Sequence, residues 1–465
     1  MYSAGVYCRV CSASAVMSVR YARLKFRTFA AMAHSLSDRG RALVDKPLRD
    51  DFELFHDAEQ NPFDPADNPS GAIPLCIAEN VLSWPEMRTR LTELAGRPLP
   101  DWVAKYTDVK GAPAFREALA GFAGRLIAPL GGREALELDP EGFAVSSGAT
   151  AVVELTSLLL GDDGDVAAFP APCYPVYAQD IGHKAHLGRY DVPCAEDWDG
   201  AEGVHPLTVA DLDAARAEVS AQGKTLRMVV LTQPDNPTGA IYTEAQLSDF
   251  ADWAIAHEVH LCVNELYALS QLDTTDARLA DDYGADPAAY FSFLHLVERH
   301  RSPYLHWWYS FSKDFGISGL RCGALYSRNA DFLQAFGNLG APHTVSNHTQ
   351  WLLAQLLTDE SWVAAFAKTN QQRLTDAYAS VVAALRQNGV AYTPARGSLF
   401  VWARLNADGA VTDEAFWRKL YEDTGVLLTG PNGFGYEERG WLRIVYSCVE
   451  PAALAEAVRR LVARL

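Results

Sequence analysis

The stretch YSFSKDFGISGLRCG, residues 309–323, carries the densest chemistry in the chain. An apolar run ends in small and hydroxyl residues, followed by Lys313, by glycines and by Arg321. An amine that must form an imine with an aldehyde needs a fixed position and a lowered pKa, which partial burial beside another cation supplies. Ser310, Ser312 and Arg321 suit a phosphate, because they combine hydroxyl donors with a planar cation. Taken alone, the stretch is also compatible with a surface lysine that follows a strand.

Three other segments place polar groups where an apolar run stops. SSGAT, residues 146–150, precedes an expected helix, whose first N–H groups and the Thr150 hydroxyl make an anion site or a plain N-cap. Asn236 lies in QPDNPTG, and Asn264 and Tyr267 lie in NELY. Ligands of open α/β sheets bind outside the carboxyl ends of the strands. The sequence therefore predicts one crevice shared by four segments.

The pattern of apolar runs predicts the fold class. Between about residues 100 and 330, short apolar runs alternate with longer amphipathic ones, which indicates strand–helix units on a parallel sheet. The expected strands are 142–147, 166–170, 227–232, 260–265, 305–310 and 322–327. After about residue 340 we expect a long helix over 350–387, strands at 399–405 and 441–447, and a closing helix over 451–465.

Bulk properties exclude several classes of protein. A length of 465 residues is too great for one simple core and predicts one large and one smaller domain, and a composition of 49% apolar and 21% charged residues is that of an ordinary globular protein. The net charge of −18 repels phosphate backbones, so we expect no nucleic-acid partner, and no apolar run is long enough for a membrane span. The eight scattered cysteines suit reduced thiols in a cytoplasmic protein. Cys8 and Cys11 form a lone C-x-x-C, so we expect no metal site.

The N-terminal residues 1–37 contain five basic residues and no acidic residue, and they are rich in Ser and Ala. An organelle-targeting segment has this composition. An over-extended start, with Met32 opening the protein, or a disordered tail explains it as well, and the Ala-, Arg- and Asp-rich remainder favours this second interpretation.

The combination of SFSKDFGISGLRCG, NPTG, NELY and PAPCYP resembles the fold-type I aminotransferases of class I and II, and within them the 1-aminocyclopropane-1-carboxylate (ACC) synthases. NPFD from Asn61 and GAIPLCIAENVLS up to Ser83 are similar to the NPYD…GLAENQLS segment of that branch. The resemblance runs from about residue 60 to the C-terminus. It implies an α/β fold with a large domain on a mostly parallel seven-stranded sheet, a smaller α+β domain, and pyridoxal 5'-phosphate as cofactor.

The domain boundaries expected from this resemblance divide the chain into four parts. They are a basic, disordered extension (1–45), an N-terminal arm with part of the small domain (46–100), the large cofactor-binding domain (101–335) and the C-terminal small domain (336–465). Members of the family are homodimers, so we expect a homodimer with active sites at the interface.

The resemblance also implies roles for residues around the cofactor. Lys313 would hold it covalently and later move the α-proton as general base, with Tyr267 and Asn264 completing the catalytic set. Tyr174 would stack on the pyridine ring. Asn236 and Tyr267 would hydrogen-bond its phenolic oxygen. Its phosphate would lie against Ala149, Thr150, Ser310 and Arg321, with Ser312 close by.

On the substrate side, the resemblance implies that Arg443 clamps a carboxylate in bidentate fashion. Glu79 would lie near the sulfonium end of the substrate. An arginine on a surface strand is the simpler explanation of Arg443, but its apolar neighbours in GWLRIVY leave it little solvent.

Two residues depart from the family pattern. Asn264 stands where the family has an aspartate that keeps the pyridine nitrogen protonated, so the ring should be a weaker electron sink unless a nearby group or water restores the proton. Glu265 points to the other face if the strand alternates. Val109 stands where the family has a tyrosine that reaches in from the partner subunit, with Tyr106 three residues earlier as a possible substitute for contacting substrate.

Three functions remain compatible with the sequence. The first is γ-elimination from S-adenosylmethionine or a similar γ-substituted amino acid, followed by cyclisation or by bond formation to a second small molecule in specialised biosynthesis. The second is exchange of an amino group with a 2-oxo acid, because both reactions use the same lysine. The third is a non-catalytic cofactor-binding relic, which the retention of Lys313, Tyr267, Arg321 and Arg443 disfavours.

Overall fold

The computed structural model describes residues 35–44, 49, 51–194, 203–283 and 288–465. It divides into two units, residues 1–47 and 48–465. The first contains helix α1 (Asp38–Val44), which has no buried residue and lies within the segment expected to be disordered. The basic segment with Cys8, Cys11 and Met32 lies outside the described residues, so the interpretations of it stay predictions.

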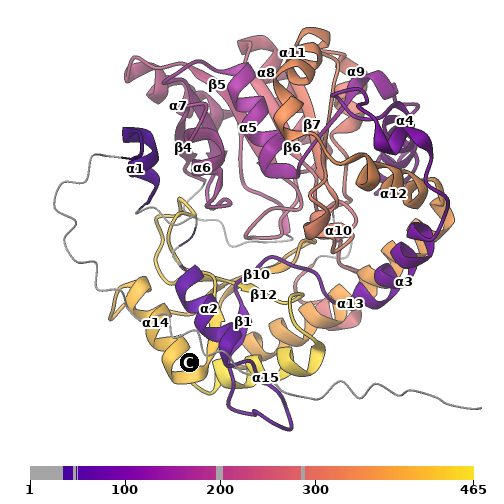
Figure 1. The fold of residues 1–465 in the computed structure, drawn as a ribbon. Coiled ribbons are helices and arrows are strands. Elements are labelled where there is room, and N and C mark those ends of the chain that lie inside the picture. The colour runs from indigo at the N-terminus through magenta and orange to yellow at the C-terminus, as the bar shows by residue number, and fades with distance from the viewer. Residues whose placement is uncertain (1–34, 45–48, 50, 195–202, 284–287) are drawn as a thin grey trace, which may run out of the picture. The chain divides into compact units, whose positions relative to one another are not determined.

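A seven-stranded sheet forms the centre of the second unit, with strand order β2-β8-β7-β6-β5-β3-β4 (Figure 1). Its strands are β2 (Phe143–Ser146), β3 (Val166–Pro170), β4 (Gly188–Val192), β5 (Leu226–Thr232), β6 (His260–Asn264), β7 (Leu305–Ser310) and β8 (Gly323–Ser327). β8 runs antiparallel to β2 and β7, and the other pairs are parallel. All six expected strands are present, and the mostly parallel seven-stranded sheet is confirmed.

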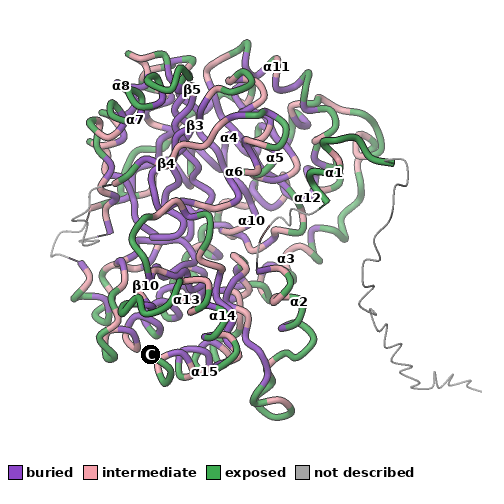
Figure 2. Tube along the Cα trace, turned by 90° about the vertical axis from the view of Figure 1, so that its left-hand side faces the viewer, coloured by how far each residue is buried: buried purple, intermediate pink, exposed green. Residues whose placement is uncertain are grey.

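Helices cover both faces of this sheet, because consecutive side chains of a strand point to opposite sides. On β7, Trp307 and Tyr309 pack into one core and Trp308 into the other, and all three are buried. One face is covered by α5 (Ala149–Leu160), α6 (Tyr177–Gly182) and α11 (Ala330–Gly340). The other is covered by α4 (Pro113–Phe122), α7 (Val209–Ala221), α8 (Glu244–His257), α9 (Leu294–His300) and α12 (Asn347–Thr358). The strands therefore run through a buried interior (Figure 2).

A third core belongs to the smaller α+β part. Its strands are β9 (Tyr392–Thr393), β10 (Phe400–Arg404) and β12 (Trp441–Val445) in an antiparallel sheet, and β1 (Ile73–Leu75) paired with β11 (Val426–Leu428). Its helices are α2 (Phe52–Gln60), α13 (Glu360–Gln387), α14 (Asp413–Thr424) and α15 (Pro451–Val462). Helix α3 (Trp84–Ala95) instead buries Met87 and Leu94 in the core of the large sheet. Short helix α10 (Phe311–Asp314), which carries Lys313, lies between the two sheets in both views (Figures 1 and 2).

The expected long helix over residues 350–387 is in fact two helices. Asp359 separates α12 from α13 with a non-helical backbone, and its carboxylate accepts a hydrogen bond from the Trp362 N–H at 3.1 Å as the N-cap of α13. The strands expected at 399–405 and 441–447 are present as β10 and β12. In the described part of the chain, no helix has both the length and the apolar character that crossing a bilayer requires.

Candidate functional site

A cavity of about 240 Å³ opens where β5, β6 and β7 end and α5 begins. We call it the central cavity. Twelve of the thirteen residues expected at the site line it, namely Glu79, Ala149, Thr150, Tyr174, Asn236, Asn264, Tyr267, Ser310, Ser312, Lys313, Arg321 and Arg443. The strand ends thus bring together segments that are far apart in the sequence, as the rule for open α/β sheets predicts. Tyr106 is the exception.

Lys313 is held at one wall of the central cavity by the turn after β7. Ser310 caps the short helix α10 by accepting a hydrogen bond from the Ser312 N–H at 3.3 Å, and the Lys313 Nζ donates to the Ala78 carbonyl at 2.6 Å. Burial first, and then the positive charge of Arg443, lower the pKa of Lys313 to about 8. A larger share of this amine is therefore unprotonated near neutral pH than of an exposed lysine.

The N-terminus of α5 and Arg321 form a cationic corner of the central cavity. The Arg321 guanidinium donates to the Ser318 carbonyl at 2.9 Å and the Ser147 carbonyl at 3.4 Å, beside Gly148, the residue before α5. Gly148 has φ +99°, and a Cβ there would lie 2.4 Å from an Arg321 nitrogen. Only glycine therefore lets the guanidinium approach the helix start. The Ser310 and Ser312 hydroxyls, 3.0 Å apart, face the same cavity.

Arg443 of β12 is buried without a carboxylate partner. Its guanidinium is 1% exposed and donates to the Asn236 Oδ1 at 2.7 Å, the Thr429 hydroxyl at 3.1 Å and the Cys76 carbonyl at 3.3 Å. It also lies 4.5 Å from the centre of the Phe400 ring. Burial lowers the pKa of Arg443 to about 10, and the nearby charge of Arg49 contributes. Within the described ranges, no acidic side chain forms an ion pair with Arg443, so a ligand carboxylate would complete it.

The Asn264 amide has a fixed orientation at the end of β6. Its nitrogen donates to the Tyr177 hydroxyl at 3.1 Å, and that hydroxyl lies 3.0 Å from the Thr232 hydroxyl. The Asn264 Oδ1 is buried and has no hydrogen-bond partner in the structure. Glu265 points to the opposite face of the sheet, as expected, where its carboxylate accepts hydrogen bonds from the Trp307 indole at 2.7 Å and three other donors.

These groups fit pyridoxal phosphate. The α5 N-terminus and Arg321 suit the phosphate, the partly deprotonated Lys313 amine suits the aldehyde, and the unpartnered Asn264 oxygen suits a polar ring atom. The Asn236 Oδ1 accepts a hydrogen bond from Arg443, so the N–H groups of the Asn236 amide stay available to a ligand oxygen. The buried Tyr267 also lines the cavity, packed edge-on against the Phe400 ring at 5.6 Å.

Tyr106 lies outside the central cavity. It is fully exposed and lines a separate surface pocket together with Val109. A contact between Tyr106 and the central cavity of the same chain is therefore not part of the structure, and a contact in a partner's cavity stays a prediction.

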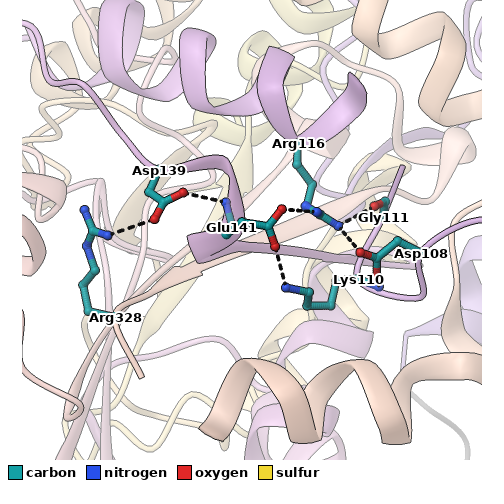
Figure 3. A network of polar contacts seen from close by, with 7 residues as sticks. All are labelled: Asp108, Lys110, Gly111, Arg116, Asp139, Glu141 and Arg328. Carbon is teal, nitrogen blue, oxygen red and sulfur yellow. Dashed lines mark hydrogen bonds and ion pairs between the residues drawn. The ribbon is translucent and has the colours of Figure 1, made fainter. Parts of the chain in front are cut away.

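The loop that carries Tyr106 and Val109 is anchored by the network in Figure 3. Arg116 donates to the Asp108 carboxylate at 2.7 Å, the Gly111 carbonyl at 2.8 Å and the Glu141 carboxylate at 2.6 Å. Lys110 forms a further bond to Glu141 at 3.1 Å. The network therefore fixes the backbone on both sides of Val109.

Sequence reasoning missed five polar residues around the central cavity. They are Tyr177, Thr232, Asp180, Arg49 and Ser318. Tyr177 and Asp180 follow Tyr174 in YPVYAQD, and this is the signal that could have pointed to them. Arg49 pairs with Asp51 and donates to the Cys76 carbonyl at 3.1 Å, an oxygen that Arg443 also binds.

Comparison with known proteins places these features in a family. The model of the family described as aminotransferase class I and II matches residues 93–461 of this chain. The chain is 30% identical to 1-aminocyclopropane-1-carboxylate synthase 5 of Oryza sativa subsp. japonica over 422 residues, which cover 87% of this chain and 75% of that protein. It is 28% identical to the probable inactive 1-aminocyclopropane-1-carboxylate synthase-like protein 2 of Mus musculus, over 89% of this chain and 69% of that protein.

Solved structures share the fold. A Thermus thermophilus aspartate aminotransferase double mutant has a TM-score of 0.72 at 19% identity, over 93% of this chain and all of that chain. The substrate-bound BacF structure from Bacillus subtilis has a TM-score of 0.71 at 22% identity, over 93% of this chain and 98% of that chain. At these identities the similarity supports the architecture.

Proposed function

Because this chain belongs to the aminotransferase class I and II family of pyridoxal phosphate enzymes, we propose that it acts at the α-carbon of an amino acid whose carboxylate binds Arg443. Pyridoxal phosphate supplies, when bound, an aldehyde for a covalent link and an electron sink for negative charge at the α-carbon. One observation carries the proposal. Lys313, with a pKa lowered to about 8, and Arg443, a buried cation without an acidic partner among the described residues, line the same cavity.

The residues of the central cavity divide into two groups in this proposal. The cofactor is held by Ala149, Thr150, Tyr174, Asn236, Asn264, Tyr267, Ser310, Ser312, Lys313 and Arg321. Arg321 and the α5 N-terminus neutralise its phosphate, and Tyr174 covers its ring. Lys313 is the covalent anchor and then the base that removes the α-proton. Arg443 orients the substrate so that the α-hydrogen faces the Lys313 Nζ.

For the substrate, we propose S-adenosylmethionine or a similar amino acid with a leaving group on the γ-carbon. The similarity to the rice 1-aminocyclopropane-1-carboxylate synthase supports it. Glu79 adds a second argument, because its carboxylate lines the cavity and is held by the Ser318 hydroxyl at 3.0 Å, where it suits a sulfonium charge. After loss of the leaving group, the product cyclises or bonds to a second substrate in specialised biosynthesis. Val109, in place of a larger side chain, leaves room for it where this loop meets the cavity of a partner chain.

A second candidate is exchange of the amino group with a 2-oxo acid. Arg49 favours it, because its guanidinium shares the Cys76 carbonyl with Arg443 and suits the second carboxylate of a diacid. Asp51 already pairs with Arg49, so this cation is less available than Arg443.

One experiment separates the candidates. The cofactor-loaded protein is incubated with S-adenosylmethionine and assayed for methylthioadenosine, then with common amino acids plus 2-oxoglutarate and assayed for glutamate. We expect methylthioadenosine from wild type and none from Lys313→Ala, while the surface variant Lys224→Ala matches wild type. Glutamate without methylthioadenosine supports the amino-group exchange instead. If neither product forms, only the interpretation as a non-catalytic relic remains.

We further propose that the protein works as a cytoplasmic homodimer with Tyr106 and Val109 near the partner's cavity. The exposed position of Tyr106 supports this, because a fully exposed aromatic side chain on an anchored loop suits a protein contact. Sedimentation of the protein with and without the Tyr106→Asp change tests it. A wild-type monomer at micromolar concentration would argue against it.

A further inference from the structure

Asp180 is a buried acid that the proposed chemistry leaves unused. It lies on α6, is 7% exposed and lines the central cavity. Its carboxylate has no hydrogen bond or ion pair with any residue of the described ranges; Lys184, four residues on, pairs with Glu154 instead, at 2.8 Å. A buried carboxyl without a partner is costly unless a ligand completes it, so its position calls for a role.

The neighbours of Asp180 show which end of the cavity it occupies. Burial first raises the pKa of both Tyr174 and Tyr177, and the charge of Asp180 adds to it. The two rings pack edge-to-face with centroids 5.4 Å apart, and the Tyr177 hydroxyl accepts a hydrogen bond from the Asn264 amide. The one ionised group of the described chain that acts on Asp180 is Glu154 on α5, whose like charge raises the pKa of Asp180. Asp180 forms no hydrogen bond or ion pair with Arg321 of the phosphate corner or with Arg443 of the carboxylate clamp.

The remaining end of the cavity is where Asn264 stands. An amide at this position carries no charge, so it cannot by itself hold a proton on a ring nitrogen. Tyr177 fixes this amide, and Asp180 lies one helical turn after Tyr177. The structure thus provides a neutral hydrogen-bonding group and a separate acid at the same end.

We propose that Asp180 is the acid that donates a proton to the pyridine nitrogen of the cofactor, beside the neutral amide of Asn264. With the cofactor bound, the O–H of the Asp180 carboxyl would supply this proton to the ring nitrogen, and the resulting Asp180 carboxylate would take it back at the end of the cycle. Burial first, and then the charge of Glu154, raise the pKa of Asp180 to about 8, so this carboxyl holds its proton at neutral pH. Facing it are Glu154, Tyr174 and Tyr177.

This inference deepens the proposed use of the cofactor and is independent of which amino acid is the substrate. Its test therefore uses the protein without any substrate. Apoprotein is titrated with pyridoxal phosphate and with the carbocyclic analogue in which CH replaces the ring nitrogen. A failure of the substrate assay leaves this measurement unaffected.

We expect wild type to bind pyridoxal phosphate about tenfold more tightly than the analogue, as one hydrogen bond to a group that can become charged predicts. Asp180→Asn should lose this preference. The double variant Asp180→Asn with Asn264→Asp should regain it. Asp163→Asn, the matched control at an exposed aspartate, should keep it, because Asp163 does not line the cavity. An Asp180→Asn protein that retains the wild-type preference overturns the proposal.

A second measurement needs no variant and covers the case in which Asp180→Asn does not fold. The ¹⁵N resonance of ring-labelled pyridoxal phosphate bound to wild type reports whether the nitrogen is hydrogen-bonded or protonated. We expect a shift away from the free-base position at pH 6 to 7, which is reduced when the pH rises above 8. A nitrogen that resonates as an unbonded free base throughout pH 6 to 9 shows that Asp180 does not act on it.

Discussion

Replacement of Arg443 by Met separates the substrate role of this residue from its structural role. With both bonds to the substrate carboxylate lost, at about 1.5 to 3 kcal/mol each for hydrogen bonds between charged groups, the affinity should fall by roughly 10² to 10⁴. The stability should change little. Burial that lowers the pKa of Arg443 to about 10 corresponds to about 3 kcal/mol of destabilisation, which Met removes. The lost bonds to Asn236, Thr429 and Cys76 cost about 1 kcal/mol each and offset that gain.

The assay compares two ligands and two variants. The cofactor-loaded protein is titrated with S-adenosylmethionine and with its decarboxylated amine, and binding is followed by the absorbance of the cofactor. Wild type should prefer the acid, and Arg443→Met should bind both alike, with a free energy of unfolding within about 2 kcal/mol of wild type. Arg404→Met is the control, because Arg404 lies on the paired strand and only forms a partly exposed ion pair with Glu438. An Arg443→Met protein that still prefers the acid more than tenfold refutes the reasoning.

Three further perturbations test other parts of the molecule. Because burial lowers the pKa of Lys313 to about 8, the rate at which apoprotein takes up cofactor should rise between pH 7 and 8 and level off above pH 9. Reduction with borohydride followed by mass spectrometry should find the cofactor attached to Lys313. A rate of uptake that is independent of pH would contradict this. Asn264→Asp should speed exchange of the substrate α-hydrogen with deuterium, measured by NMR, and an unchanged rate would show that the charge at this position is irrelevant. Arg116→Met should lower the free energy of urea unfolding at pH 7 by about 1 to 2 kcal/mol, less than for a fully buried pair because Glu141 is exposed. Hydrogen bonds from Lys110 first, and then from Arg116, hold the pKa of Asp108 and Glu141 below their ordinary values. The contribution of the Arg116 pairs is therefore present above about pH 4 and disappears as the pH falls through the lowered values. The variant and wild type should converge in stability near pH 2, and a constant difference would argue against this pairing.

The elements that the sequence predicts well are those whose local pattern matches their burial. β5, β6 and β7 read as continuous apolar runs because both of their faces are covered, and they are buried along nearly their whole length. β4, with the sequence GRYDV, lies at the edge of the sheet and is mostly half-buried, so its polar side chains concealed it. The break at Asp359 was equally hidden, since no glycine or proline marks it.

The candidate site divides in the same way. Polar residues that directly follow an apolar strand, such as Asn264 and Ser310, could be found because the strand ends of an α/β sheet meet at one edge. Tyr177 and Asp180 carry only a weak signal, their place shortly after Tyr174, because their roles depend on how α6 packs beside β5 and β6. Tertiary packing decides this, and it leaves no periodic trace in the sequence.

The mouse relative is described as probably inactive, which raises the question whether this chain is also a relic without activity. The charges of the central cavity bear on that question. Lys313, Arg443 and Asp180 are ionisable groups in one cavity, and in the part of the chain that is described none of them forms an ion pair with a protein side chain. Each makes the fold less stable, since burial opposes its charged form. Most replacements by a neutral side chain would relieve that cost, so a chain free of functional demands would have no physical reason to keep all three. In the function proposed above, the same three groups would face the aldehyde carbon of the cofactor, the carboxylate of the amino acid and the ring nitrogen. Their cost to the fold would then be the condition for binding and proton transfer, and this favours an active enzyme over a relic.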